Sequence, residues 1–286
     1  MTGFSSLKAL EQFAKSELDG AGISNFENEA RWIIAETLGL STSTLRLRAD
    51  DPIPKAQLDL VRKALERRCS GEPLSYVLGT ADFRGNEFEV DSGVLIPRPE
   101  TEQIVDIVGT DLKRRGVKRC LEVGVGSGCI AVSLLLEHPE LTMVATDISL
   151  EALSVCKRNA AAHGVDGRLQ LIHGSVTSGV DEEPFGWIIS NPPYIAVDDQ
   201  RVAPDVRQYE PAVALFADKR GLAVIEAIAV EARRYLAPDG HLIVEHGDGQ
   251  SESVVAEFAK RGFETLQHLD CFGKLRFVEG WVNSGS

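Results

Sequence analysis

Cysteine is scarce in this chain of 286 residues, and the cysteines present are not spaced as metal ligands. Their number is odd and they are scattered, which favours reduced thiols over disulfides; they are Cys69, Cys120, Cys129, Cys156 and Cys271. The six histidines form no cluster either. We therefore expect no metal site.

Long apolar runs are also missing from the sequence. No stretch reaches the roughly 20 residues that a membrane-spanning helix needs, and the first residues lack the pattern of a secretion signal. With 43% hydrophobic residues and dispersed charge, the composition indicates a soluble globular protein. We expect a cytoplasmic monomer with no membrane partner.

Positive charge is in deficit, because the net charge is −13. This balance disfavours a duplex nucleic acid as partner, since a phosphate backbone requires a basic surface. Residues 1–80 carry ten Lys or Arg against eleven Asp or Glu, so nearly all the acidity lies after them. The basic residues Arg62, Lys63, Arg67 and Arg68 lie in this first part, where an ordinary solvated helix face is the simpler interpretation.

Apolar residues recur every three or four positions over residues 7–18 and 30–38, which is the spacing of amphipathic helices. A third segment, 54–68, has the same spacing and begins with proline, which suits a first helical turn. The sequence therefore predicts a small helical domain over residues 1–80.

A short linker is expected over residues 81–95. Alternating apolar and polar residues around Gly85-Asn86 predict a β-hairpin there, connecting the helical domain with the rest of the chain. Residues 96–102 read Ile-Pro-Arg-Pro-Glu-Thr-Glu, a stiff segment that leads into a further helix.

Strands and helices alternate from Arg119 onwards, the pattern of a parallel sheet that is covered on both faces. We expect strands at residues 119–123, 142–147, 169–173, 187–190, 241–245, 264–269 and 276–281. We expect helices at residues 129–138, 150–163, 221–236 and 251–261.

A glycine-rich turn joins the first of these strands to its helix, with glycine at positions 124, 126 and 128. Such a turn lets the backbone approach a ligand at the carboxyl edge of a sheet. Cys129 stands where a dinucleotide fingerprint has its third glycine, so a ligand without pyrophosphate fits better. Asp147, at the end of the next strand, can accept both ribose hydroxyls of an adenosine. Together with the Asn-Pro-Pro-Tyr motif at residues 191–194, which ends a further strand at the same edge, these features predict S-adenosylmethionine as the cofactor.

The segment 188–194 reads Ile-Ile-Ser-Asn-Pro-Pro-Tyr and predicts a strand that ends in a proline-stiffened motif. The Asn191 side-chain oxygen and the Pro192 carbonyl can converge as two acceptors on one planar NH2 group, with Tyr194 beside them. This suits a side-chain amide or the exocyclic amine of a base, whose lone pair is then aimed at an electrophile. No neighbouring residue in the sequence suggests a strong general base.

These motifs together resemble the release-factor glutamine methyltransferases, the PrmC/HemK family, over nearly the whole chain. Asn-Pro-Pro-Tyr alone also resembles adenine-N6 DNA methyltransferases, whereas the helical domain and the Pro-Arg-Pro-Glu-Thr-Glu stretch specify the family. The further matching segments lie at residues 73–79, 83–85, 147–149, 209–211, 214–216, 221–222 and 270–276.

The resemblance implies an α/β fold, with a Rossmann-like class I S-adenosylmethionine-dependent methyltransferase domain over residues 96–286. It further implies the substrate, the glutamine of the Gly-Gly-Gln motif in peptide chain release factors, which is methylated on N5. Because the helical domain over residues 1–80 is separate and relatively basic, we expect it to dock this protein substrate. The catalytic residues would be Asn191, Pro192 and Tyr194. The cofactor-binding residues would be Glu122, Gly124, Val125, Gly126, Ser127, Gly128, Asp147, Ile148, Ser175, Val176 and Asn191. The substrate-binding residues would be Asn191, Pro192, Pro193, Tyr194 and Arg98.

The chain departs from the family pattern at a few positions. Glu122 stands where an aspartate is usual, Val125 replaces a threonine, and Gly186 replaces an aspartate. Ser175 and Val176 stand where an acid and an aromatic residue commonly flank the adenine. Adenine-N6 methylation of nucleic acid, glutamine methylation of a ribosomal protein, and a non-catalytic binding role remain as alternatives.

Overall fold

The computed structural model describes residues 6–282, which divide into two compact units. The smaller unit comprises the chain up to Thr80 together with Ala203–Tyr209. The larger unit comprises Ala81–Val202 and the chain from Glu210 onwards. We describe each unit by itself.

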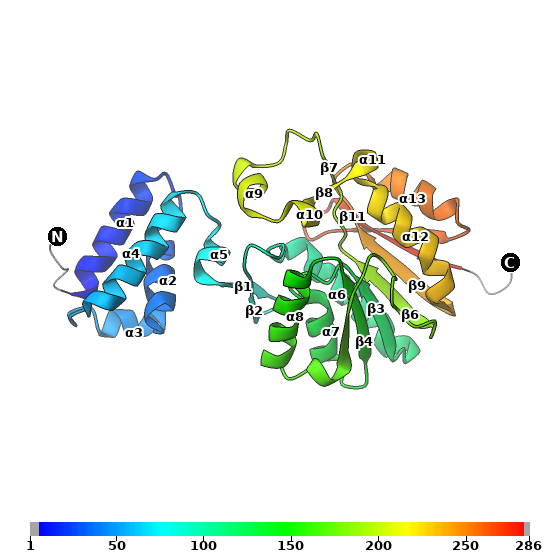
Figure 1. Ribbon diagram of the computed structural model, residues 1–286, viewed down its shortest axis with the longest axis horizontal. Coiled ribbons are helices and arrows are strands. Elements are labelled where there is room, and N and C mark those ends of the chain that lie inside the picture. Colours follow the sequence, from blue (N-terminus) through cyan, green and yellow to red (C-terminus); the bar gives the residue numbers. More distant parts are fainter. Residues whose placement is uncertain (1–5, 283–286) are drawn as a thin grey trace. The chain divides into compact units, whose positions relative to one another are not determined.

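The smaller unit is helical, and its core follows the predicted spacing. Leu10 and Leu18 on the first helix are buried, as are Ile33 and Ile34 on the second. The hydroxyl of Tyr209 donates to the Ser70 carbonyl (2.8 Å), so the segment from the later part of the chain is tied to the unit. The helices are α1 (Leu7–Gly20), α2 (Phe26–Leu38), α3 (Thr42–Leu47), α4 (Lys55–Cys69), α5 (Leu74–Leu78) and α9 (Pro204–Tyr209) (Figure 1).

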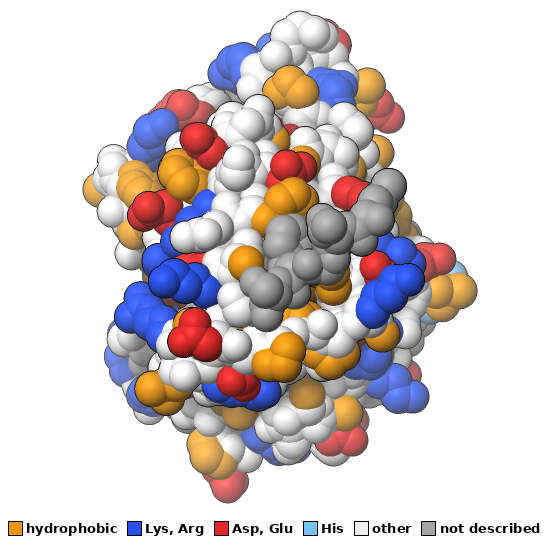
Figure 2. Space-filling model, turned by 90° about the vertical axis from the view of Figure 1, so that its left-hand side faces the viewer, with side chains coloured by type: hydrophobic (Ala, Val, Ile, Leu, Met, Phe, Trp, Pro, Cys, Tyr) orange, Lys and Arg blue, Asp and Glu red, His pale blue; other side chains and the backbone are white. Residues whose placement is uncertain are grey.

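Two of the four basic residues singled out on α4 are engaged within this unit. Arg67 Nε donates to Glu72 (2.8 Å), and Arg68 Nε donates to Glu29 (2.6 Å). Lys63, by contrast, is exposed. In the space-filling view, positive and negative side chains are interspersed on the face turned to the viewer (Figure 2). Much of the basic run therefore stabilises the helices themselves.

The predicted hairpin is present as β1 (Thr80–Phe83) and β2 (Asn86–Glu89). Its two-residue turn is Arg84-Gly85, and both residues have positive φ angles, 55° and 70°. Positive φ angles at both central positions are typical of a type I′ turn, whose backbone twist matches the right-handed twist of the two flanking strands. The predicted turn, Gly85-Asn86, was one residue late, because Asn86 already belongs to β2.

The larger unit contains a seven-stranded sheet in the order β10-β11-β9-β6-β3-β4-β5. Its strands are β3 (Arg119–Val123), β4 (Thr142–Asp147), β5 (Leu169–His173), β6 (Phe185–Ser190), β9 (Leu236–Glu245), β10 (Glu264–Leu269) and β11 (Leu275–Trp281). Its main helices are η1 (Pro99–Thr101), α6 (Glu102–Arg115), α7 (Cys129–Glu137), α8 (Leu150–Ala162), η2 (Asp166–Arg168), α12 (Ala223–Tyr235) and α13 (Ser251–Ala259). Short elements follow β6, namely β7 (Ile195–Ala196), α10 (Ala212–Leu215), β8 (Phe216–Ala217) and α11 (Asp218–Gly221).

The expectation of a fully parallel sheet is wrong for one strand, β11, whose pairings with both of its neighbours are antiparallel. β9, β6, β3, β4 and β5 are parallel, but β11 runs antiparallel to both β9 and β10. The connection between β10 and β11 is a tight turn in which the Asp270 amide donates to the Lys274 carbonyl (2.7 Å). So short a turn joins antiparallel neighbours, whereas a parallel pair needs a crossover.

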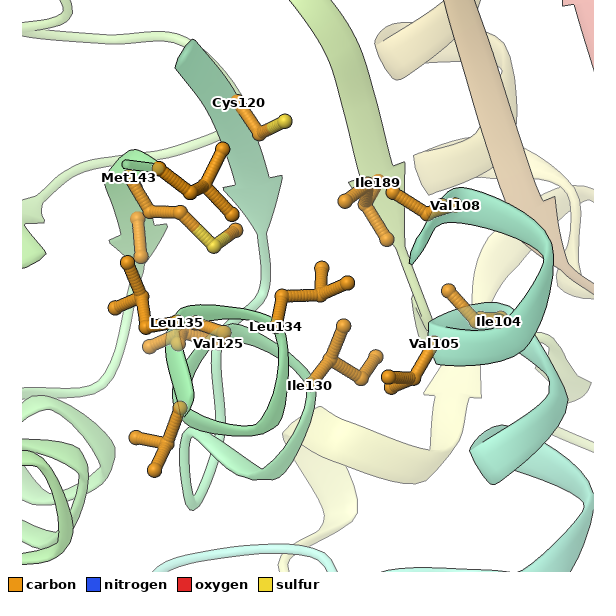
Figure 3. Close-up of a cluster of buried hydrophobic side chains, with 14 of the residues drawn as sticks. Ile104, Val105, Val108, Cys120, Val125, Ile130, Leu134, Leu135, Met143 and Ile189 are labelled. Atoms are coloured by element: carbon orange, nitrogen blue, oxygen red, sulfur yellow. The ribbon is translucent and has the colours of Figure 1, made fainter. Parts of the chain in front are cut away.

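Alternate residues of the central strands pack against helices on opposite faces of the sheet. Ile189 of β6 faces α6 and α7, where Val105, Val108 and Ile130 complete one core (Figure 3). The neighbouring Ile188 belongs to a second core with α12 and α13. Both faces of the sheet are thus covered, as the continuous apolar character of these strands predicts.

Within residues 6–282, no helix is both long and apolar enough to cross a membrane. The same residues hold no cluster of three or more His, Cys, Asp or Glu side chains that could bind a metal ion.

Candidate active site

A pocket lies in the larger unit, where parallel strands β3, β4 and β6 end at one edge of the sheet. Val123 pairs with Thr146 on one side and with Ser190 on the other, which brings the following loops together. This is the edge at which open α/β sheets bind ligands. The predicted site residues that line the pocket are Arg98, Glu122, Gly124, Val125, Gly126, Ser127, Asp147, Ile148, Ser175, Val176, Asn191 and Pro193.

Three predicted residues, Gly128, Pro192 and Tyr194, are absent from the pocket wall. Gly128 shapes the turn from behind, with a φ of 83°; a Cβ there would lie 2.6 Å from the Cys156 sulfur. Pro192 is buried, and Tyr194 points its hydroxyl to a carboxylate outside the wall. The binding roles of all these residues stay predictions.

The glycine turn is held open by backbone hydrogen bonds. The amides of Gly124 and Val125 both donate to the Thr146 carbonyl, at 2.8 and 3.0 Å. Gly124 and Gly126 have φ angles of 76° and 54°, which side chains with a Cβ rarely adopt. The turn therefore presents bare backbone to the pocket.

Asp147 fastens the glycine turn as well as facing the pocket. Its Oδ2 accepts the amide of Gly126 (3.0 Å), and its Oδ1 accepts the amide of Ser149 (2.9 Å). A carboxylate offers about four acceptor positions, so each oxygen can still accept a hydroxyl. The predicted ribose contact is compatible with this geometry.

Glu122 is buried beneath the turn at the end of β3 and is 1% exposed. Burial raises its pKa well above the usual value, and the charge of Asp147 raises it further, although the Ala131 amide lowers it. Its Oε2 has no hydrogen-bond partner among the described residues. A buried polar atom without a partner is costly, so a polar ligand group that pairs with it would be stabilising.

The pocket therefore fits the expected cofactor. It is lined by the unpartnered polar atom of Glu122, by the Asp147 carboxylate, which can bind ribose hydroxyls, and by the backbone of the glycine turn. Val176, in the region expected at the adenine, has a positive φ of 52° and accepts the Thr146 hydroxyl through its carbonyl (2.7 Å). That bond fixes an unfavourable backbone conformation at the pocket wall.

Asn191 follows β6, and its side chain is oriented by hydrogen bonds. Its Nδ2 donates to the Thr101 hydroxyl (3.2 Å), which donates in turn to Oε2 of Glu245 (2.8 Å). Tyr194 donates its hydroxyl to the other oxygen of Glu245 (3.0 Å). The Asn191 oxygen has no protein partner within the described chain and remains available as an acceptor.

Thr101 and Glu245 are the residues that the sequence interpretation missed. Glu245 ends β9, directly beside β6, where Val244 pairs with Ser190. An acid at the end of a buried strand was a usable signal. Thr101 lay inside the recognised Pro-Arg-Pro-Glu-Thr-Glu stretch without a role of its own.

Arg98 is held by a buried acid rather than free in the pocket. Its Nη2 donates to Glu210 (2.5 Å), and the other carboxylate oxygen accepts the Ile96 amide (3.4 Å). Arg98 lines the pocket while it is paired with Glu210, and its contact with substrate stays a prediction.

Comparison with known proteins agrees with this geometry. The PrmC N-terminal domain family matches residues 9–79, and the methyltransferase small domain family matches residues 105–208. A methyltransferase structure from Pyrococcus furiosus has a TM-score of 0.53 at 20% identity, covering 70% of this chain and 91% of that one. The predicted methyltransferase fold is thereby confirmed.

Full-length relatives specify the family. The bifunctional methyltransferase of Rickettsia conorii is 36% identical over 90% of this chain, but the chain spans only 54% of that protein. The chain thus covers about half the length of such relatives. The release factor glutamine methyltransferase of Geobacter sulfurreducens is 37% identical, with 93% of this chain and 91% of the relative covered. The chain belongs to the release factor glutamine methyltransferase family.

Proposed function

We propose that this protein transfers a methyl group from S-adenosylmethionine to the side-chain amide nitrogen, N5, of the glutamine in the Gly-Gly-Gln motif of peptide chain release factors. The observation that carries the proposal is the fixed Asn191 amide, whose nitrogen is committed to Thr101 and whose oxygen is unpartnered. It lines the same pocket as Asp147 and the glycine turn. An amide acceptor beside a cofactor pocket suits a substrate NH2 group.

Asn191 and Pro192 would bind that NH2 group through two carbonyl oxygens. Accepting both hydrogens fixes the nitrogen and leaves its lone pair free to attack. Bound S-adenosylmethionine supplies a methyl group on a positively charged sulfur: the N–C bond forms as the S–C bond breaks, and sulfur keeps the electron pair. The nitrogen then loses a proton to water, so Asn191 needs no strong base beside it.

For the cofactor itself, we propose that Asp147 binds the ribose hydroxyls and that Glu122 forms a hydrogen bond with the cofactor at its unpartnered Oε2. The turn from Gly124 to Gly128 would approach the cofactor through its backbone. Ile148, Ser175 and Val176 would flank the adenine.

The helical domain, residues 1–80, is proposed to dock the release factor, with residues 81–95 as the linker and 96–286 as the catalytic domain. A monomer acting on a translation factor in the cytoplasm accords with this role. Deleting residues 1–79 should leave S-adenosylmethionine binding intact, measured by calorimetry, and abolish turnover on the intact release factor. Normal turnover by the folded truncated chain would refute the docking role.

The function is tested by incubating the purified chain with labelled S-adenosylmethionine and a purified release factor. Peptide mass spectrometry should place one methyl group on the Gly-Gly-Gln glutamine. A release factor with that glutamine replaced by glutamate is the matched control and should remain unlabelled. Label on duplex DNA or on a ribosomal protein, but not on the release factor, would refute the proposal in favour of those substrates.

A further inference from the structure

An asparagine amide can be turned in two ways, since its oxygen and its NH2 group have nearly the same size and shape. Only one orientation places the acceptor oxygen toward a substrate NH2 group. The other would present two N–H donors to it. The reaction proposed above therefore needs a device that sets the orientation of Asn191.

The hydrogen bonds of the site have a direction, and Glu245 sets it. An ionised carboxylate only accepts, so the Thr101 hydroxyl must give its hydrogen to Glu245 (2.8 Å). Thr101 is then left with lone pairs alone on the side of Asn191, and the group bonded to it is the Asn191 NH2 (3.2 Å). The Asn191 oxygen is consequently turned away from Thr101.

The same carboxylate also fixes the aromatic residue of the motif. Tyr194 donates its hydroxyl to the second oxygen of Glu245 (3.0 Å), so each oxygen receives one side-chain donor. Glu245 is 1% and Thr101 2% exposed, which keeps water from competing for these bonds. A single buried charge thus anchors both side chains of the motif that the proposed mechanism uses.

We propose that Glu245 is a positioning residue that orients the Asn191 amide through Thr101 and the Tyr194 ring directly. The inference rests on the proposed function, because it assigns a purpose to the orientation that amide methylation requires. Glu245 contacts neither substrate nor cofactor, and it transfers no proton in the reaction.

The protonation of Glu245 makes the device sensitive to pH. Burial raises the pKa of Glu245 to about 7, against the opposing effects of the Thr101 and Tyr194 hydrogen bonds and the positive Arg276; the negative Glu100 raises it further. Above this pH the carboxylate accepts from both hydroxyls. Below it, the protonated acid can donate to Thr101, whose hydroxyl is then free to donate toward Asn191 and to favour the wrong amide orientation.

The first test compares turnover at saturating cofactor and substrate. Thr101→Val removes the link with little change in shape and should lower kcat by roughly tenfold or more, as loss of an oriented polar contact does. Thr101→Ser retains the hydroxyl and should recover most of the activity. Because Thr101 lines the pocket, the cofactor Kd is measured for both variants, so that kcat is compared at full saturation. If Thr101 had only a structural role, the valine and serine variants would not differ in kcat while both keep the fold, and that result would overturn the inference.

The second test is the pH profile of kcat. The wild type should lose activity as the pH falls through about 7, where Glu245 takes up its proton. Glu245→Gln cannot titrate, so its kcat should be lower and should lack this acidic limb. Glu279→Gln is the matched control: Glu279 is also a buried acid that accepts two side-chain hydrogen bonds, from His241 and His268. It should keep the wild-type profile.

The third test does not depend on catalysis. The side-chain NH2 resonances of Asn191, identified by their loss in Asn191→Ala, can be followed by 15N NMR. They should shift with a midpoint near 7 in the wild type, and neither Glu245→Gln nor Thr101→Val should show that titration. If the Asn191 resonances change neither with pH nor on Glu245→Gln or Thr101→Val, the inference is overturned even if the enzyme is active. An inactive wild type with titrating resonances would refute the proposed function and leave the orienting role standing.

Discussion

Replacing Asp147 with alanine should weaken S-adenosylmethionine binding by more than the loss of a ribose contact. Its two oxygens already accept the amides of Gly126 and Ser149, at 3.0 and 2.9 Å. Alanine removes these acceptors together with the proposed ribose acceptors. Two backbone donors in the pocket wall then lose their partner, and the glycine turn loosens.

The size of the effect follows from the bonds that are lost. A hydrogen bond to a charged group contributes about 1.5–3 kcal/mol, and about 1.4 kcal/mol corresponds to a factor of ten in Kd. Loss of the ribose contact alone therefore predicts a rise in Kd of roughly 10- to 150-fold. Asp147→Asn keeps one acceptor oxygen and should show a smaller rise.

Titration calorimetry with S-adenosylmethionine measures the effect, and thermal unfolding without ligand separates it from a loss of fold. Asp166→Ala is the control, since Asp166 is an exposed acid in η2 outside the pocket. An Asp147→Ala protein that folds normally and binds the cofactor with the wild-type Kd would remove Asp147 from the site and refute this reasoning.

The remaining predictions concern catalysis, the turn and acid stability. Asn191→Ala should keep the fold and lose roughly 10²-fold or more in single-turnover methyl transfer at saturating cofactor; a rate within a few-fold of wild type contradicts the two-acceptor mechanism. Gly128→Ala should lower the free energy of unfolding in urea by about 1–2 kcal/mol for its left-handed φ alone. The new Cβ would also lie 2.6 Å from the Cys156 sulfur, and this clash should lower the free energy of unfolding further. Adding Cys156→Ala should remove the cost of the clash but not the cost of the left-handed φ. The last prediction concerns Glu279. Burial alone would raise the pKa of this carboxyl, but hydrogen bonds from His241 and His268 lower it to about 2. Since folding lowers the pKa of Glu279, the ionised carboxylate should stabilise the fold fully above pH 4.5, and this contribution should be lost as the pH falls toward 2. In Glu279→Gln, the free energy of unfolding should depend less on pH between 4.5 and 2.

Much of the fold could be predicted because its strands and helices have strong local signals. The expected strands at 119–123, 142–147 and 169–173 match β3, β4 and β5 residue for residue. β9 begins at Leu236, five residues before the expected start at residue 241. The later start was expected because Pro-Asp-Gly at 238–240 is typical of a turn. Here the chain stays in the strand through a register irregularity beside Phe185, which depends on a neighbour far away in the sequence.

Strand direction is the clearest example of what local pattern does not determine. A buried strand has the same continuous apolar character whether its neighbours are parallel or antiparallel, so β11 could not be told from a parallel strand by composition. The information lay in the connection, since the five residues between Leu269 and Leu275 are too few for a crossover.

The pocket residues were predictable to the extent that they follow strands in the sequence, because parallel strands end at one edge of a sheet. The orientation of Asn191 is a different kind of property. It depends on the direction of two hydrogen bonds, from Asn191 to Thr101 and from Thr101 to Glu245, between residues separated by 90 and 144 positions. Residue types at fixed spacing show that an amide and an acid are present, but not which hydrogen points where. A motif can therefore be intact and still be wrongly oriented if Thr101 or Glu245 changes. In this family, we expect loss of activity without loss of the Asn-Pro-Pro-Tyr motif to arise from those two positions.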